Sequence, residues 1–174
     1  MAKQNQVDLA ALRRFQQAVA TDPAQARRTQ RLEGAWIFAP GEPQFRAQLS
    51  LPGGSVVSLE ADQPPFLGGS GSRPGPIQYA LFGLAACFTA TFATVAAEQG
   101  IELSRLETAA EMDLDLSRTL GLSQRPIMEE VRLVVQAQGD ASPETLAEVL
   151  RQAEDRCPAS FCLTHPVRLS ARLA

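Results

Sequence analysis

The pattern of hydrophobic and polar positions is dominated by one uncharged stretch at residues 76–97, which reads PIQYALFGLAACFTATFATVAA. Arg73 is the last charged residue before it and Glu98 is the first after it. A run of this length predicts a helix, because strands rarely exceed about ten residues. Since no face of this helix carries a charge, we expect it to be buried nearly all round.

A helical-wheel projection at about 100° per residue divides the stretch into two faces. The face of Cys87 carries small residues, namely Ala80, Gly83, Ala90, Thr91 and Thr94. The adjoining face carries mostly large ones, namely Leu81, Leu84, Phe88, Phe92 and Val95. The large face is expected in the core, and the small face lets another element approach the sulfur. This arrangement suits a thiol that meets a partner, and it equally suits tight packing around an inert core cysteine.

The stretch is also long enough to cross a membrane. Its richness in Ala and Thr, and the lack of a flanking cluster of Lys and Arg, favour a buried helix instead.

Before this stretch, the period of the apolar positions changes from helical to alternating. Residues 7–20 have helical spacing and end at Asp22-Pro23. Three short strands are predicted at residues 35–38, 44–49 and 55–59, separated by turns that contain Pro and Gly. Short connections between successive strands predict an antiparallel meander. The Gly-rich segment that follows, FLGGSGSRPGP, lacks the spacing of a phosphate-binding motif and is interpreted as a positioning loop.

After the long helix, alternation predicts strands at residues 103–116 and 127–138 with a loop between them. Ser142-Pro143-Glu144 is a typical helix start, and the apolar stripe that follows reaches Cys157. Pro158 is expected to end that helix, and residues 167–173 are predicted to form a closing strand. The order of elements predicts an α+β fold with a cysteine on each of two helices.

The composition and net charge of the chain limit the kinds of partner and compartment that fit it. The chain has 174 residues and a net charge of −3, which argues against nucleic acid or an anionic membrane as the main partner. The N-terminus lacks the apolar core of a signal peptide, and three cysteines in such a chain indicate a reducing, cytoplasmic location. Their spacing fits no zinc site, so we expect thiol chemistry without a metal or cofactor.

Two motifs resemble the OsmC/Ohr family: LGGSGSRPGPIQYALFGLAACF, which contains Cys87, and AEDRCP, which contains Cys157. The resemblance runs from about residue 33 to the C-terminus, so residues 1–32 are interpreted as a helical extension and residues 33–174 as the OsmC-like domain. It implies antiparallel sheets wrapped around two central helices in an intertwined homodimer. It also implies a peroxidase of the oxidative stress response that reduces organic hydroperoxides, with Cys87 as the peroxidatic thiol, Cys157 as the resolving thiol and a thiol reductant.

The sequence departs from the family's pattern at one supporting position. Catalytic members carry a Glu nine residues before the first Cys, where it holds an Arg against the thiolate, and this chain has Gln78 there. Arg46 and Arg73 are the candidates for that arginine. Cys162 has no counterpart in the family, and His165, the only histidine, is assigned a structural or surface role. The missing Glu and the large apolar face leave a second hypothesis open, in which a catalytically weak protein binds an apolar small molecule at the dimer interface.

Overall fold

The computed structural model describes residues 3–173 and divides into two compact units. One unit is Gln17–Ala80. The other combines the start of the chain, up to Gln16, with the residues from Leu81 onward. Two helices, α1 (Leu9–Thr21) and α2 (Pro76–Glu98), each begin in one unit and end in the other. The first was predicted from helical spacing and the second from the length of its uncharged run, and the observed ends lie within two residues of the predicted ones.

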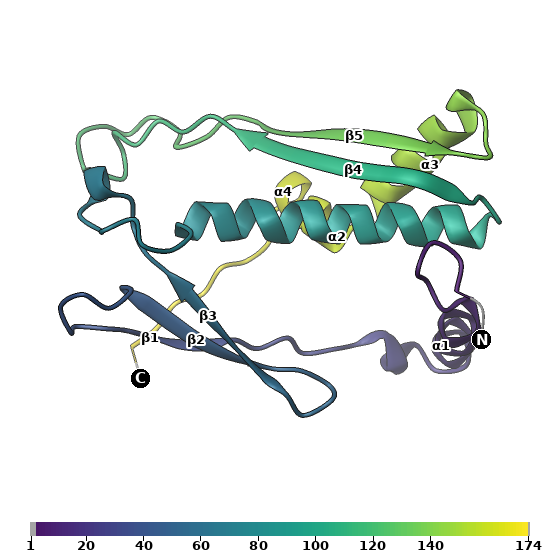
Figure 1. The fold of residues 1–174 in the computed structure, drawn as a ribbon, viewed down its shortest axis with the longest axis horizontal. Coiled ribbons are helices and arrows are strands. Elements are labelled where there is room, and N and C mark those ends of the chain that lie inside the picture. Colours follow the sequence, from purple (N-terminus) through teal and green to yellow (C-terminus); the bar gives the residue numbers. More distant parts are fainter. Residues whose placement is uncertain (1–2, 174) are drawn as a thin grey trace. The chain divides into compact units, whose positions relative to one another are not determined.

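The Gln17–Ala80 unit is built on a three-stranded antiparallel sheet in the order β1-β2-β3, as the meander prediction required (Figure 1). Its strands are β1 (Glu33–Trp36), β2 (Phe45–Ser50) and β3 (Val56–Ala61). Two 3-10 turns flank the sheet, at Pro23–Ala26 and Pro65–Leu67. The first strand begins two residues earlier than predicted, because Glu33 and Gly34 also pair with β2.

The Gly-rich loop after β3 folds around the carboxylate of Asp62, whose residue is only 2% exposed. Asp62 Oδ2 accepts hydrogen bonds from the backbone N–H groups of Ser70 and Ser72, each at 3.1 Å, and from both serine hydroxyls. Gly69 has to be glycine here, because a Cβ would lie 1.9 Å from the carbonyl oxygen of Gln63. The loop is therefore a structural device that sets up the start of α2, as its interpretation as a positioning loop anticipated.

We expect Asp62 to make folding stability depend on acid pH. The hydroxyl of Ser70 and the backbone N–H of Ser72 lower the pKa of Asp62 from 3.8 to about 2. A lowered folded-state pKa stabilises the protein above about pH 4, and this contribution is lost as the pH falls towards 2. Asp62→Asn should lower the melting temperature at pH 7 by about 5 °C and flatten its dependence on pH between 4 and 2. Equal acid slopes for both proteins in thermal melts would contradict this role.

The second unit places a β-hairpin and two helices against α2 (Figure 1). Its elements are the part of α2 from Leu81, the antiparallel pair β4 (Leu103–Met112) and β5 (Val131–Gly139), α3 (Pro143–Arg156) and α4 (Pro158–Thr164). The start of the chain joins this unit through Asn5, whose side chain donates to the carbonyl of Ile101 and accepts from the N–H of Leu103, both at 2.9 Å.

The core of this unit lies between α2 and α3. The large face of α2 supplies Phe88, Phe92 and Val95, each at most 3% exposed. Helix α3 adds Val149 and Ala153, both fully buried, and Ser142 caps its start by accepting from the N–H of Thr145 at 3.2 Å. Helix α2 is long and apolar enough to span a membrane by length and composition alone. Its large side chains are instead used in this core, as the wheel projection predicted.

Three features of the C-terminal half and of α2 differ from the prediction. Pro158 ends α3 but also opens the unpredicted helix α4, because proline is favoured in the first turn of a helix. Residues 167–173 were predicted as a strand and pair with no strand among residues 3–173, and alternation alone cannot make a strand without an edge to bind. Helix α2 is also not buried all round, since Phe82 is 72% exposed and Gly83, Ala86 and Ala90 are exposed beside it.

Candidate functional site: the Cys87 and Cys157 thiols

The structure brings Cys87 and Cys157 together although they are 70 residues apart in the sequence. Their sulfur atoms lie 3.6 Å apart, which is within hydrogen-bonding distance and longer than the roughly 2.05 Å of a disulfide. Cys87 lies in the middle of α2, and Cys157 joins the end of α3 to the start of α4. Both cysteines are free thiols. A movement of less than about 2 Å would link them.

The two thiols differ in exposure. Cys157 is fully buried and belongs to the core with Val149 and Ala153. Cys87 is partly exposed and packs against that core from its edge. A small molecule that enters from solvent therefore meets the sulfur of Cys87 before that of Cys157.

The electrostatic surroundings of the two thiols also differ. Burial is the main cause that raises the pKa of Cys87; the backbone N–H of Ala159 acts against it, and the neighbouring Cys157 adds to the rise. Burial acts to raise the pKa of Cys157 too, but hydrogen bonds from the backbone N–H and hydroxyl of Ser160, and from the thiol of Cys87, outweigh burial and leave this pKa below its ordinary value. Because the two sulfur atoms are in contact, the thiols lose their protons as a pair and not independently.

Ser160 was not identified from the sequence as part of this site. It is 7% exposed and lies three residues after Cys157, in the first turn of α4. The signal was present in Pro158, because proline is favoured at the first position of a helix and would place Ser160 in its first turn. Interpreting Pro158 only as the end of a helix concealed it.

Gln78 has a structural partner at the start of α2. Its side-chain oxygen accepts a hydrogen bond from the backbone N–H of Gly75 at 2.7 Å, while the carbonyl of Gly75 accepts from the N–H of Tyr79 at 3.2 Å. A glutamine in the third position that reaches back to the residue before the helix is half of a capping box. Gln78 thus helps to begin α2.

Arg46 and Arg73 meet at one carboxylate, that of Glu60 in β3. Arg46 Nε lies 2.9 Å from Glu60 Oε1, and Arg73 Nε lies 2.7 Å from Glu60 Oε2. Arg46 also pairs with Glu42 at 2.8 Å. The two guanidinium groups, Arg73 first, lower the pKa of Glu60. The sequence could have predicted part of this cluster, because Arg46 and Glu60 are directly opposite in the β2–β3 register and opposite charges favour such pairs.

The remaining candidates lie on or after α4. Cys162 is exposed. The ring of His165 stacks on Phe161 with centroids 4.1 Å apart, and its Nδ1 lies 3.0 Å from the hydroxyl of Thr164. These contacts agree with the structural role assigned to His165.

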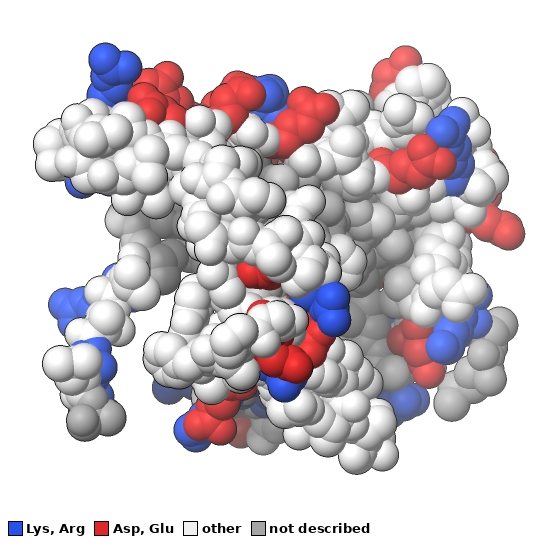
Figure 2. All heavy atoms as spheres, turned by 60° about the vertical axis from the view of Figure 1, so that its left-hand side comes forward, with Lys and Arg blue, Asp and Glu red and all other residues white. Residues whose placement is uncertain are grey.

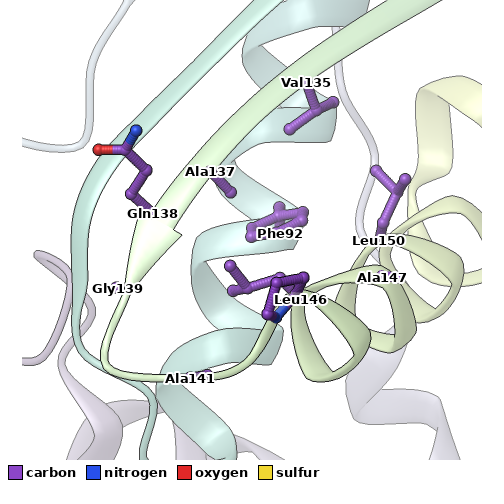
Figure 3. A pocket seen from close by; sticks show the side chains of 10 residues that line it. Phe92, Val135, Ala137, Gln138, Gly139, Ala141, Leu146, Ala147 and Leu150 are labelled. Carbon is purple, nitrogen blue, oxygen red and sulfur yellow. The ribbon is translucent and has the colours of Figure 1, made fainter.

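The thiol-bearing unit also holds an apolar cavity of about 460 Å³ between α2, β5 and α3. Figure 3 shows Phe92 of α2 facing Leu146 of α3, with Val135 and Ala137 of β5 on the other side. The residues that line it bear no charge, and neither cysteine is among them. Gln138, Pro143, Ala147 and Leu150 in its lining are exposed, so this cavity opens to solvent and lies apart from the sulfur atoms.

Comparison with known proteins places the chain in a family. The profile of OsmC-like proteins matches residues 69–172, which include Cys87 and Cys157. The comparison with curated proteins gives no match.

Solved structures share the fold at low sequence identity. An OsmC-like protein from Mycoplasma pneumoniae is 20% identical, with a TM-score of 0.58 over 79% of this chain and 88% of that one. The organic hydroperoxide resistance protein OsmC of Legionella pneumophila is 22% identical, with a TM-score of 0.55 over 79% and 90%. An organic hydroperoxide resistance protein of Elizabethkingia anophelis is 18% identical, with a TM-score of 0.54 over 77% and 88%.

Proposed function

The chain belongs to the OsmC-like protein family, and from this membership together with the thiol pair we propose that it reduces organic hydroperoxides. Cys87 attacks the peroxide, Cys157 closes a disulfide with it, and a dithiol reductant of the cytoplasm restores both thiols. The observation that carries the proposal is the 3.6 Å separation of the two sulfur atoms. It supports a pair that can be oxidised without rearrangement of the core.

Turnover of an organic hydroperoxide tests this function. We expect the purified protein to consume cumene hydroperoxide catalytically in the presence of dithiothreitol, and to be faster with it than with hydrogen peroxide. The apolar core against which Cys87 packs, which includes Phe88 and Phe92, motivates that preference. Consumption no faster than that by dithiothreitol alone would overturn the proposal.

A second candidate function is the binding of an apolar small molecule. The Gln17–Ala80 unit holds a cavity of about 410 Å³ whose lining is almost wholly apolar and includes Trp36, Phe45 and Tyr79. The engagement of Gln78 in the helix start and of both arginines with Glu60 also fits a chain with reduced catalytic support. Trp36 is the only tryptophan, so its fluorescence should respond to a hydrophobic ligand. An unchanged spectrum across a titration with 1-anilinonaphthalene-8-sulfonate would remove this candidate.

We further propose that the protein is a homodimer, because α2 leaves an apolar face open. Phe82 is 72% exposed, next to Gly83, Ala86 and Ala90. In Figure 2, charged side chains stand in separate clusters between wide areas of uncharged surface. Exposed apolar patches of this kind mark association sites.

Sedimentation at micromolar concentration should give twice the chain mass of 18.7 kDa. Phe82→Arg should weaken association by about 100-fold, because it buries an unpaired charge at the interface. A wild-type protein that sediments as a folded monomer would exclude the dimer.

A further inference from the structure

Glu98 is the last residue of α2 and the first charge after its uncharged run. A negative charge is unfavourable at the C-terminal end of a helix, where the helix dipole is itself negative. The Glu98 side chain is nevertheless only 20% exposed, and both its oxygens have partners. Oε1 accepts from Gln16 Nε2 at 2.6 Å, and Oε2 lies 2.7 Å from a guanidinium nitrogen of Arg156. A residue that its own helix disfavours, yet whose carboxylate is fully engaged, indicates a role beyond α2.

The ion pair between Glu98 and Arg156 connects the two segments that carry the close thiols. Arg156 is the last residue of α3 and directly precedes Cys157. Glu98 follows Cys87 by eleven residues, which is about three turns of helix, so the two lie on the same face of α2. The pair therefore ties the residue next to Cys157 to the face of α2 that bears Cys87.

Cys157 needs such a tie because it lies at a junction in the backbone. It is the single residue between α3 and α4, and its backbone is extended. Pro158, which follows it, has no N–H with which to continue the hydrogen bonding of α3. Side-chain contacts at the end of α3 therefore help to set where Cys157 lies. Besides Arg156, α3 contacts the end of α2 through Gln152, which accepts from Gln99 at 3.0 Å.

The N-terminal extension is fastened beside the end of α2. Asn5 and Gln6 have left-handed backbone angles, with φ of 51° and 65°, in a turn closed by two hydrogen bonds between Gln4 and Val7 at 3.1 and 2.7 Å. Residues other than glycine adopt this conformation at a cost, which asparagine tolerates best. The turn aims the side chain of Asn5 at the backbone of residues 101–103. It thereby anchors the start of α1, and Gln16 of that helix reaches Glu98.

We propose that Gln16, Glu98 and Arg156 form a clamp that positions Cys157 for closing the disulfide with Cys87. This inference rests on the proposed peroxidase function, and the three are positioning residues that act through Cys157. In the closing step the sulfur of Cys157 attacks that of the Cys87 sulfenic acid and the S–O bond breaks. The leaving hydroxide combines with the proton of Cys157 to form water.

The clamp acts on the distance that this step has to cover. The sulfur atoms lie 3.6 Å apart and must come to about 2.05 Å. A small displacement of one reacting group is enough to slow such a step. Loosening the end of α3 should therefore slow closure and make the disulfide less favourable, without changing the attack of Cys87 on peroxide.

The first test measures the disulfide without peroxide. Protein with Cys162→Ser, which leaves only Cys87 and Cys157, is equilibrated with reduced and oxidised glutathione, and the remaining thiols are counted by alkylation and mass spectrometry. Glu98→Gln should shift this equilibrium towards the thiols by about fivefold, the upper end for an ion pair of this exposure. Arg151→Gln is the matched control, because it removes an ion pair within α3 alone. An equilibrium unchanged by Glu98→Gln would overturn the inference.

Charge reversal distinguishes the clamp from a general loss of structure. Glu98→Arg and Arg156→Glu each bring like charges together, and each should shift the glutathione equilibrium further than Glu98→Gln does. The double variant restores opposite charges and should return the equilibrium to within about twofold of the parent. Gln16→Ala should have a smaller effect, because it removes a neutral donor. A double variant no closer to the parent than its two single variants would contradict the clamp.

The last test separates the two steps of a single turnover with cumene hydroperoxide. Peroxide consumption reports the attack by Cys87, and loss of the second thiol reports closure by Cys157. In Glu98→Gln the first rate should equal that of the parent, and the second should fall by about fivefold. A slower attack with unchanged closure would refute the clamp even if the protein is a peroxidase. A protein that forms the disulfide with glutathione but consumes no peroxide would contradict the peroxidase function alone, and the glutathione equilibrium would still decide on the clamp.

Discussion

Replacing Cys87 with serine should reduce the rate of organic hydroperoxide consumption by about 1,000-fold or more, which corresponds to about 4 kcal/mol of lost transition-state stabilisation. The thiolate is the nucleophile in this chemistry, and a serine hydroxyl at neutral pH neither ionises nor forms a product equivalent to sulfenic acid. Cys87 is also the more accessible member of the close pair. The consumption of cumene hydroperoxide under saturating dithiothreitol measures the effect.

Cys162→Ser is the matched control, because it removes one thiol that is exposed and outside the close pair. We expect this variant to keep the wild-type rate within about twofold. The assignment of the chemistry to Cys87 fails if Cys87→Ser remains active, or if Cys162→Ser is the variant that loses activity.

Phe92→Ala should destabilise the fold by about 3–5 kcal/mol, since it empties a large buried volume that the neighbouring residues cannot refill. The side chain is 1% exposed and packs with Val95 and Val149 in the core between α2 and α3. It also lines the apolar pocket of Figure 3, so the space left by its ring would join that pocket. A loss of this size is a large share of the roughly 5–15 kcal/mol that stabilises a typical domain.

Denaturant unfolding followed by circular dichroism measures this loss. Phe38→Ala provides the control, because Phe38 is 90% exposed and its removal should change stability by no more than about 0.5 kcal/mol. A similar loss of unfolding free energy in Phe92→Ala and Phe38→Ala would mean that Phe92 does not lie in the core.

Local signals in the sequence were enough for most helices and strands. The uncharged run of α2, the Ser142-Pro143 start of α3 and the alternation of β4 and β5 each depend on neighbouring residues, so their prediction did not need the tertiary fold. Helix α4 was missed because Pro158 was interpreted only as the end of α3. Proline is also favoured in the first turn of a helix, and here it begins α4. The strand expected at 167–173 depends on a pairing edge, which no local pattern can supply.

The candidate site was predictable in its residues but not in its geometry. The motifs pointed to Cys87 and Cys157, whereas the 3.6 Å distance arises from the packing of α3 and α4 on α2. The lowered pKa of Cys157 depends on the turn of α4 that brings Ser160 back to the sulfur, and this helix was not expected. Gln78 was considered as a catalytic support, and its hydrogen bond to Gly75 depends on where α2 begins.

The pairing of the cysteines after oxidation tests the central claim most directly. The protein is treated with one equivalent of cumene hydroperoxide, unreacted thiols are alkylated, and the disulfide-linked peptides are identified by mass spectrometry. The account predicts the loss of two thiols per chain and a link between Cys87 and Cys157, with Cys162 alkylated. A link between Cys157 and Cys162, with Cys87 left as a thiol, would contradict it.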